Sequence, residues 1–194
     1  MKARGKTVGI SMFAARFLLF LVPLLAVWWL VLPWYGWGLM QTSGIVLRNG
    51  LGMPILSGAV QAEGVLNTES RMTFTLTDGR NRTMKIALLV TNVPPFLALV
   101  LASTGLSWRR RLRALAIGTL ILLAGHWAFI VVAMRWQDAL MRASEIPTAM
   151  IQFFLTLPFL LWIALAYWEK LVDLVTGEGG ERPGGAGANS GTQP

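Results

Sequence analysis

The stretch Ile86–Ala102, which reads IALLVTNVPPFLALVLA, decides how this chain is organised. It is apolar enough to enter a bilayer, but the segment TNVPP at residues 91–95 interrupts it. Each proline removes a backbone donor, and a helix in hydrocarbon has no water to replace the lost hydrogen bond. Prolines cost least in the first turn of a helix, where the N–H groups are unpaired anyway. The stretch therefore predicts a junction at the outer membrane interface, where a polar segment ends and a membrane helix begins.

The composition is that of a membrane protein. Of 194 residues, 55% are hydrophobic and 13% charged, and nine are tryptophan. A net charge of +8 would suggest nucleic-acid binding in a soluble protein, but here the basic residues gather before the first apolar run and in the loop at 107–113. We therefore expect no nucleic-acid partner. The absence of cysteine excludes disulfides, thiolate metal sites and thiol catalysis.

Residues 1–40 are predicted to form a basic N-terminus and the first transmembrane helix. The apolar run Phe13–Leu39 is far longer than the ~7–15 residues of a signal-peptide core, which predicts an uncleaved helix. Pro33 is expected to bend or end it. Tryptophans crowd its second half and indicate the outer interface.

Residues 41–85 are predicted to form a β-rich extracytoplasmic insertion. In Arg71–Thr77, apolar residues alternate with threonines, which is typical of a half-buried strand. A turn at 78–79 and a second arm, Arg82–Leu88, complete a hairpin, and Ile55–Leu66 predicts one or two further short strands. Because an isolated hairpin is marginally stable, we expect a small sheet packed against the helices or a partner.

Residues 86–170 are predicted to contain transmembrane helices two to four. The basic loop at 107–113 indicates the cytoplasmic side, with a third helix at Ala114–Met134 and a fourth from about Thr148 to Trp168. The Gly-rich tail at 171–194 is expected to be a disordered cytoplasmic segment. The predicted fold is thus a mainly α membrane protein of four transmembrane helices, with a small β-rich insertion between the first two and both termini cytoplasmic.

His126 is the only histidine and lies within the third predicted helix. An ionisable residue in a membrane span is a candidate functional residue. The favoured interpretation is structural: a neutral imidazole hydrogen-bonds a neighbouring helix, which Gly125 would allow to approach closely. One histidine without cysteines or clustered carboxylates cannot complete a zinc site, so no metal or other cofactor is expected.

Asn92 has two compatible interpretations. Its side chain could bind an extended peptide or orient a group of a partner, or it could cap the helix that Pro94 and Pro95 begin, which we favour slightly. The hydroxyl of Thr91 has no general base nearby in the sequence that could activate it as a nucleophile. No catalytic residue is assigned.

The polar segment between predicted helices three and four carries two pairs of charged residues. Arg135 and Asp138 lie three residues apart, as do Arg142 and Glu145. They predict a charged rim at the outer face. Such pairs usually solvate an interface, and two carboxylates alone do not establish acid–base catalysis.

An outer polar motif that enters a helix, the turn WRRRLR at 108–113 and a returning helix resemble the core of the exosortase and archaeosortase membrane transpeptidases. Those families have a catalytic cysteine where the outer segment enters the helix. Here that place reads LVTNVPP (89–95), so the nucleophile is not carried over, and neither His126 nor Arg135 aligns with the family's histidine and arginine. In length, helix layout and the segment TNVPPF (91–96), the chain more closely resembles the membrane proteins associated with exosortase H, over roughly Lys85–Met134.

This resemblance implies a non-catalytic accessory protein of an exosortase-type sorting system in the bacterial inner membrane. Its implied partners are the lipid bilayer and the transpeptidase or its sorting-signal substrates. The candidate partner-binding residues are Thr91, Asn92, Pro94, Pro95, His126 and Arg135. The alternative is a cysteine-independent membrane enzyme that acts on peptide or lipid with His126 and an outer carboxylate or arginine. A small transporter subunit is weaker, because the spans offer few polar residues.

Overall fold

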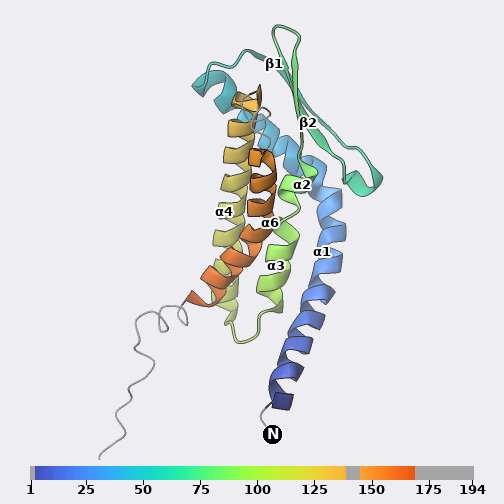
Figure 1. Cartoon of the computed structure of the whole chain (residues 1–194), viewed down its shortest axis with the longest axis vertical. Coiled ribbons are helices and arrows are strands. Elements are labelled where there is room, and N and C mark those ends of the chain that lie inside the picture. Colours follow the sequence, from blue (N-terminus) through green and yellow to red (C-terminus); the bar gives the residue numbers. More distant parts are fainter. Residues whose placement is uncertain (1–2, 139–144, 169–194) are drawn as a thin grey trace, which may run out of the picture.

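The structure, a computed structural model, describes residues 3–138 and 145–168. Most of this part is helical, and a small sheet lies at one end (Figure 1). The helices are α1 (Ala3–Ile45), α2 (Ala87–Val90), α3 (Val93–Ala102), α4 (Trp108–Arg135) and α6 (Glu145–Ala166). The strands are β1 (Ile55–Gln61), β2 (Arg71–Leu76) and β3 (Asn81–Lys85). A mainly α chain with a small β-rich insertion is confirmed, while the tail at 171–194 lies outside the described residues.

Helix α1 continues beyond its expected end. It passes through Pro23 and Pro33 to Ile45, and a turn of π-helix at Val46–Gly50 follows. Pro33 has no N–H to donate to the carbonyl of Trp29, four residues earlier. The side-chain amide of Asn67 donates to that carbonyl at 3.0 Å instead. A donor from the insertion therefore replaces the bond that Pro33 removes, and the helix does not end there.

The predicted hairpin is confirmed as part of an antiparallel sheet with the order β1-β2-β3. On β2, Met72, Phe74 and Leu76 are buried and alternate with partly exposed residues, as the period of two requires. Gly79, with φ +78°, supplies the left-handed position of the turn between β2 and β3. The third strand ends at Lys85, three residues before the predicted end of the second arm.

The apolar face of the sheet packs on the last part of α1. Phe74 lies over Gly44 of α1, and Gly58 of β1 faces the side chain of Met40. These residues belong to the larger hydrophobic core, which also includes residues of α4 and α6. The sheet is therefore fixed to the helices of its own chain.

Helix α3 is the central helix and contacts α1, α4 and α6. Most of its side chains are buried, and Phe96 is fully buried. Its ring occupies the space beside Gly118 of α4, where a Cβ atom would overlap the ring. The glycine that permits close helix approach is thus Gly118 rather than Gly125, whose added Cβ would lie 3.6 Å from the ring of Phe154.

Two helices are long and apolar enough to cross a membrane, within Ser11–Gly50 and Trp108–Arg135. Only 11% and 28% of their most apolar segments are buried, so neither resembles the core helix of a soluble protein. Many large apolar side chains of these helices are exposed, such as Leu19, Leu30 and Leu120. The other apolar stretches, Ala87–Ala102 and Gln152–Ala166, are shorter than a full span. Four transmembrane helices are therefore not confirmed.

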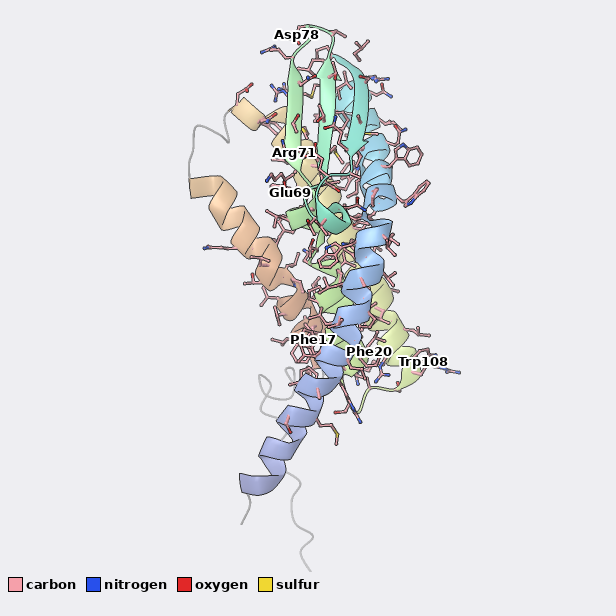
Figure 2. All side chains as sticks on the ribbon, turned by 90° about the vertical axis from the view of Figure 1, so that its right-hand side faces the viewer. Phe17, Phe20, Glu69, Arg71, Asp78 and Trp108 are labelled. Carbon is pink, nitrogen blue, oxygen red and sulfur yellow. The ribbon has the colours of Figure 1, made fainter. Side chains whose placement is uncertain are left out.

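The two ends of the molecule differ in structure. The first residues of α1, the turn between α3 and α4 and the last turns of α6 lie at one end, and the sheet lies at the other (Figure 1). In Figure 2, Phe17, Phe20 and Trp108 are labelled toward the first end, and Glu69, Arg71 and Asp78 toward the second. The end that carries the sheet is called the sheet end below, and the opposite one the loop end.

Candidate functional site

Four helical segments meet at a chain of buried hydrogen bonds centred on His126. The hydroxyl of Tyr35 in α1 lies 2.9 Å from His126 Nδ1. His126 Nε2 lies 2.9 Å from Asn92 Oδ1, at the junction of α2 and α3. Asn92 Nδ2 donates to the carbonyl of Phe154 in α6 at 3.2 Å. We call Tyr35, His126, Asn92 and the Phe154 carbonyl the polar relay.

The direction of the protons along the polar relay follows from its last member. A carbonyl oxygen only accepts, so Asn92 must present its NH₂ group to Phe154 and its Oδ1 to the imidazole. His126 then donates from Nε2, and its Nδ1 accepts the hydroxyl proton of Tyr35. A neutral imidazole with its proton on Nε2 satisfies every contact in one direction, from α1 to α6.

Pro158 explains why the Phe154 carbonyl needs a donor from outside α6. Pro158 lies four residues after Phe154 and has no N–H to donate to its carbonyl. Asn92 supplies the missing donor, just as Asn67 does for the Trp29 carbonyl that Pro33 leaves unpaired. Each of these two helix prolines thus has a distant asparagine that pairs the carbonyl it leaves free.

The polar relay is closed to the outside at His126 and Asn92, while Tyr35 is partly exposed. His126 is 0% exposed and Asn92 4%. Aromatic rings enclose the imidazole: Tyr35 lies edge-on at 6.1 Å, and Phe154 lies 5.7 Å away between centroids. Because both ring nitrogens are already paired within the chain, His126 has no free nitrogen to offer to a substrate. The prediction that it hydrogen-bonds a neighbouring helix is confirmed.

The prediction that Asn92 caps α3 with its side chain is wrong. Asn92 has helical backbone angles and makes no side-chain capping bond, because its amide is used by α4 and α6. The hydroxyl of Thr91 donates to the carbonyl of Ala87, and Pro94 is buried while Pro95 is half-buried. These residues of the junction therefore form the interior of the bundle, and Asn92 and His126 present no surface to a partner.

Arg135 lies apart from the polar relay. It ends α4 nine residues after His126, about 14 Å further along the axis at 1.5 Å per residue, and its side chain lies over the ring of Trp136 at 5.7 Å. Asp138, expected to pair with Arg135, pairs with Arg82 of β3 at 2.9 Å. The structure therefore does not bring His126 together with the outer arginine or carboxylate. Arg142 lies outside the described residues.

Arg82 joins the sheet to the end of α4. Its Nη1 donates to the carbonyl of Met134 at 2.6 Å, which pairs one of the last carbonyls of the helix. Gln137 Nε2 donates to the carbonyl of Thr83 on the outer side of β3 at 3.2 Å. One edge of the sheet is thus tied to α4.

Sequence reasoning missed Tyr35, Phe154, Pro158 and Asn67. Tyr35 lies among tryptophans that are typical of a membrane interface, so the sequence predicted an interfacial residue and not a hydrogen bond to His126. The prolines were the available signal: a proline inside an apolar helix leaves a carbonyl four residues earlier that needs a distant donor. Which donor is used depends on the tertiary fold.

Comparison with protein-family models, with curated proteins and with solved structures finds no match to this chain.

Proposed function

We propose that this chain is an integral membrane protein in which α1 and α4 cross the bilayer. At 1.5 Å per residue, α4 is about 42 Å long, which matches a bilayer of ~40–45 Å including its headgroup regions. Exposed tryptophans lie near both ends of the spans: Trp34 and Trp37 toward the sheet, and Trp108 at the start of α4. In this arrangement α2–α3 carries the chain back from the sheet end to the loop end, packed against α1 and α4, and α6 returns it once more.

The proposed orientation places the loop end in the cytoplasm of a bacterial cell and the sheet end outside the inner membrane. The stretch predicted as a basic loop, residues 107–113, is helical from Trp108 and forms the first turns of α4. Its arginines and the basic N-terminal segment still support this orientation, because basic segments next to a span stay on the cytoplasmic side. Both termini are then cytoplasmic.

Within this frame, the chain acts as a non-catalytic accessory protein of an exosortase-type sorting system. The resemblance over Lys85–Met134 supports the choice of system. The observation that carries the non-catalytic role is the polar relay, whose histidine is fully buried and has both nitrogens paired within the chain. The surface left for a partner is the sheet, beyond the proposed membrane.

The outer edge of β1 is the contact that we propose for the transpeptidase or for its substrate's sorting signal. The edge of β3 is tied to α4, whereas β1 pairs only with β2, and within residues 3–138 and 145–168 no hydrogen bond reaches its other side. Leu56, Ser57 and Ala59 are exposed there. An exposed edge strand pairs readily with an extended peptide.

The test is photo-crosslinking in intact membranes from position 57 on β1, with position 85 on β3 as the control. Both positions are exposed and lie on opposite edges of one sheet. Capture of a transpeptidase or a sorting-signal protein from position 57 and not from 85 is the expected result. Equal capture from both, capture of lipid alone, or normal sorting in cells that lack only this gene would defeat the accessory role.

One observation favours the alternative of a cysteine-independent enzyme. The order Tyr35–His126–Asn92 is that of a hydroxyl, a base and an orienting amide in nucleophilic catalysis. His126→Ala separates the two functions. An enzyme would lose turnover while its melting temperature is kept, whereas a structural relay would lose thermal stability first.

A further inference from the structure

Arginines at the two ends of the molecule have different partners. At the sheet end, Arg71, Arg80 and Arg82 each form an ion pair, with Glu63, Asp78 and Asp138 respectively. At the loop end, Arg109, Arg110, Arg111 and Arg113 begin α4 without any acidic residue in its first turn. Of the residues that the structure describes, Arg109 and Arg113 take part in none of the ion pairs.

The four arginines at the start of α4 carry an electrostatic cost. The N-terminal end of a helix bears a partial positive charge, so cations there are unfavourable. Arg111 is partly compensated, since its Nη2 donates to the carbonyl of Ser103 at 2.7 Å. Arg109 and Arg113 are exposed and lie four residues apart on one face of the helix. An anion bound at this face would offset the positive charges of Arg109 and Arg113.

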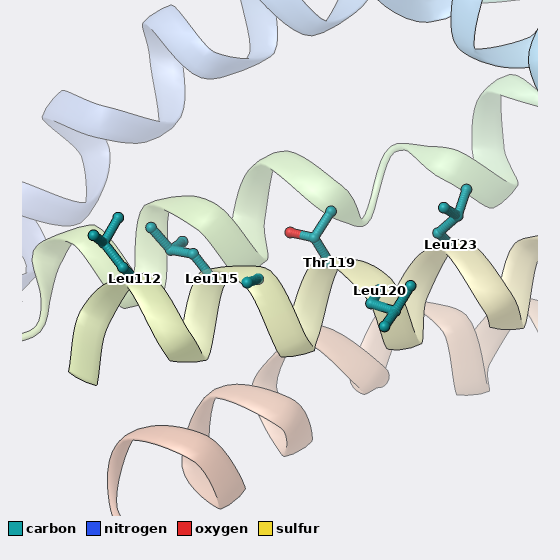
Figure 3. Close-up of a pocket in the computed structure, with 6 residues that line it drawn as sticks. Leu112, Leu115, Thr119, Leu120 and Leu123 are labelled. Carbon is teal, nitrogen blue, oxygen red and sulfur yellow. The ribbon is translucent and has the colours of Figure 1, made fainter. Parts of the chain in front are cut away.

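An apolar groove begins directly beside these two arginines. It is shallow and wide open, has a volume of about 520 Å³, and all of its lining residues belong to α4 (Figure 3). Its lining residues are Leu112, Leu115, Ala116, Thr119, Leu120 and Leu123. Arg109 precedes Leu112 by three residues, and Arg113 precedes Ala116 by three, so the cations continue the face that carries the groove.

The length of the groove fits one leaflet. From Leu112 to Leu123 the helix rises about 16 Å, which is close to half of the ~30 Å hydrocarbon thickness. The cationic end matches the phosphate of a phospholipid, and the open apolar face, one leaflet long, matches its acyl chain. General attraction of positive segments to the membrane accounts for the arginines, and the apolar face that follows them on the same helix offers a place for an acyl chain.

We propose that this groove binds one anionic phospholipid of the inner leaflet. Its phosphate contacts Arg109 and Arg113, and one acyl chain lies along Leu112–Leu123. The occupant is a membrane lipid rather than free phosphate, because the apolar groove is the larger part of the site. This inference rests on the proposed position of α4 across the membrane.

The test uses the full chain purified in a neutral detergent, with phosphatidylglycerol or phosphatidylcholine added. Native mass spectrometry counts the bound lipids, and the melting temperature reports stabilisation. We expect one retained phosphatidylglycerol and a higher melting temperature than with phosphatidylcholine. Arg109→Gln and Arg113→Gln should each weaken binding about fivefold, since a basic residue near a membrane surface contributes roughly 1 kcal/mol.

Two matched controls separate a site from general charge and general bulk. Arg16→Gln removes one exposed positive charge from α1, which supplies no residue to the groove, and should leave binding unchanged. Ala116→Trp fills the groove and should abolish the preference for phosphatidylglycerol, whereas Ile117→Trp, at the next and also exposed position, should keep it. Equal losses in Arg16→Gln and Arg109→Gln, no effect of Ala116→Trp, or equal stabilisation by inorganic phosphate would overturn the proposal.

Carbonate extraction of membranes distinguishes the failure of this inference from the failure of the membrane proposal. A chain released by carbonate is not integral, and both proposals fall. A chain that stays in the membrane but shows no preference for anionic lipid overturns the lipid site alone.

Discussion

At the scale of the residue, Asn92 is the side chain on which the polar relay depends. It pairs with His126 and with the Phe154 carbonyl that Pro158 leaves free, so it joins α4 and α6 at the break between α2 and α3. Such a buried amide contributes little net free energy while both of its hydrogen bonds are made. Its removal is costly, because both partners are then buried without a hydrogen bond. The predictions at this scale use that asymmetry.

Asn92→Ala should lower the free energy of unfolding by about 2–5 kcal/mol, because the His126 Nε2 proton and the Phe154 carbonyl are left buried and unpaired. Tyr35→Phe should cost about 1–3 kcal/mol, since it strands only His126 Nδ1. The measurement is thermal or denaturant unfolding of the purified chain in detergent. Unchanged stability in Asn92→Ala would contradict the structural role of the relay.

Pro158→Ala tests the pairing of proline and asparagine directly. An alanine at 158 has an N–H that can donate to the Phe154 carbonyl within α6. In that background Asn92→Ala should cost about 1–3 kcal/mol less than in the natural chain. A double-mutant cycle of unfolding free energies measures the difference. Strictly additive costs would show that the contribution of Asn92 to stability does not depend on Pro158.

Asn67 offers a second test of the same principle in the insertion. It has φ +63°, so Asn67→Gly keeps the backbone conformation while it removes the amide that donates to Trp29. We expect a loss of about 1–3 kcal/mol in unfolding free energy. The loss should shrink when Pro33→Ala restores an N–H to α1; an equal loss in both backgrounds would refute the assignment.

At the scale of the element, the packing of α3 on α4 depends on Gly118. Gly118→Ala would push a methyl group into the fully buried ring of Phe96, and overpacking of this kind costs typically 1–3 kcal/mol. Gly125→Ala on the same helix is the control, because its new Cβ would make an ordinary contact of 3.6 Å with Phe154. Unfolding in detergent compares the two. Equal effects would show that the close approach at Gly118 is not limiting.

The elements also show what the sequence could predict. The alternation of Met72, Phe74 and Leu76 predicted β2 because a strand has a period of two, whatever packs against it. The end of α1 could not be predicted in the same way, since its passage through Pro33 depends on Asn67, a residue 34 positions later. For the same reason the sequence named His126 and Asn92 as candidates but not their contact.

The number of membrane spans was predicted from apolar length, and length alone does not distinguish a span from a helix packed inside a bundle. Helix α3 is apolar because it is enclosed by α1, α4 and α6. In contrast, α1 and α4 are apolar and exposed, which is the combination that a lipid environment requires.

At the scale of the whole molecule, the proposed orientation makes a sharp labelling prediction. The chain has no cysteine, so a single introduced cysteine gives an unambiguous signal. Ser57→Cys on β1 should react with a membrane-impermeant maleimide in intact spheroplasts, whereas Thr104→Cys in the exposed α3–α4 turn should react only after permeabilisation. The reverse pattern would invert the orientation, and reaction of both from outside would remove α4 as a span.

The bond between Asn67 and Trp29 also has a consequence for biogenesis. When α1 leaves the ribosome, Asn67 has not yet been synthesised, and the Trp29 carbonyl has no donor within its helix. In the proposed orientation, α1 enters the bilayer with this carbonyl unpaired, and the carbonyl gains its donor only after the β1–β2 connection that carries Asn67 has been translocated and has docked. A chain whose insertion fails to dock therefore keeps a carbonyl without a donor in the middle of its first helix.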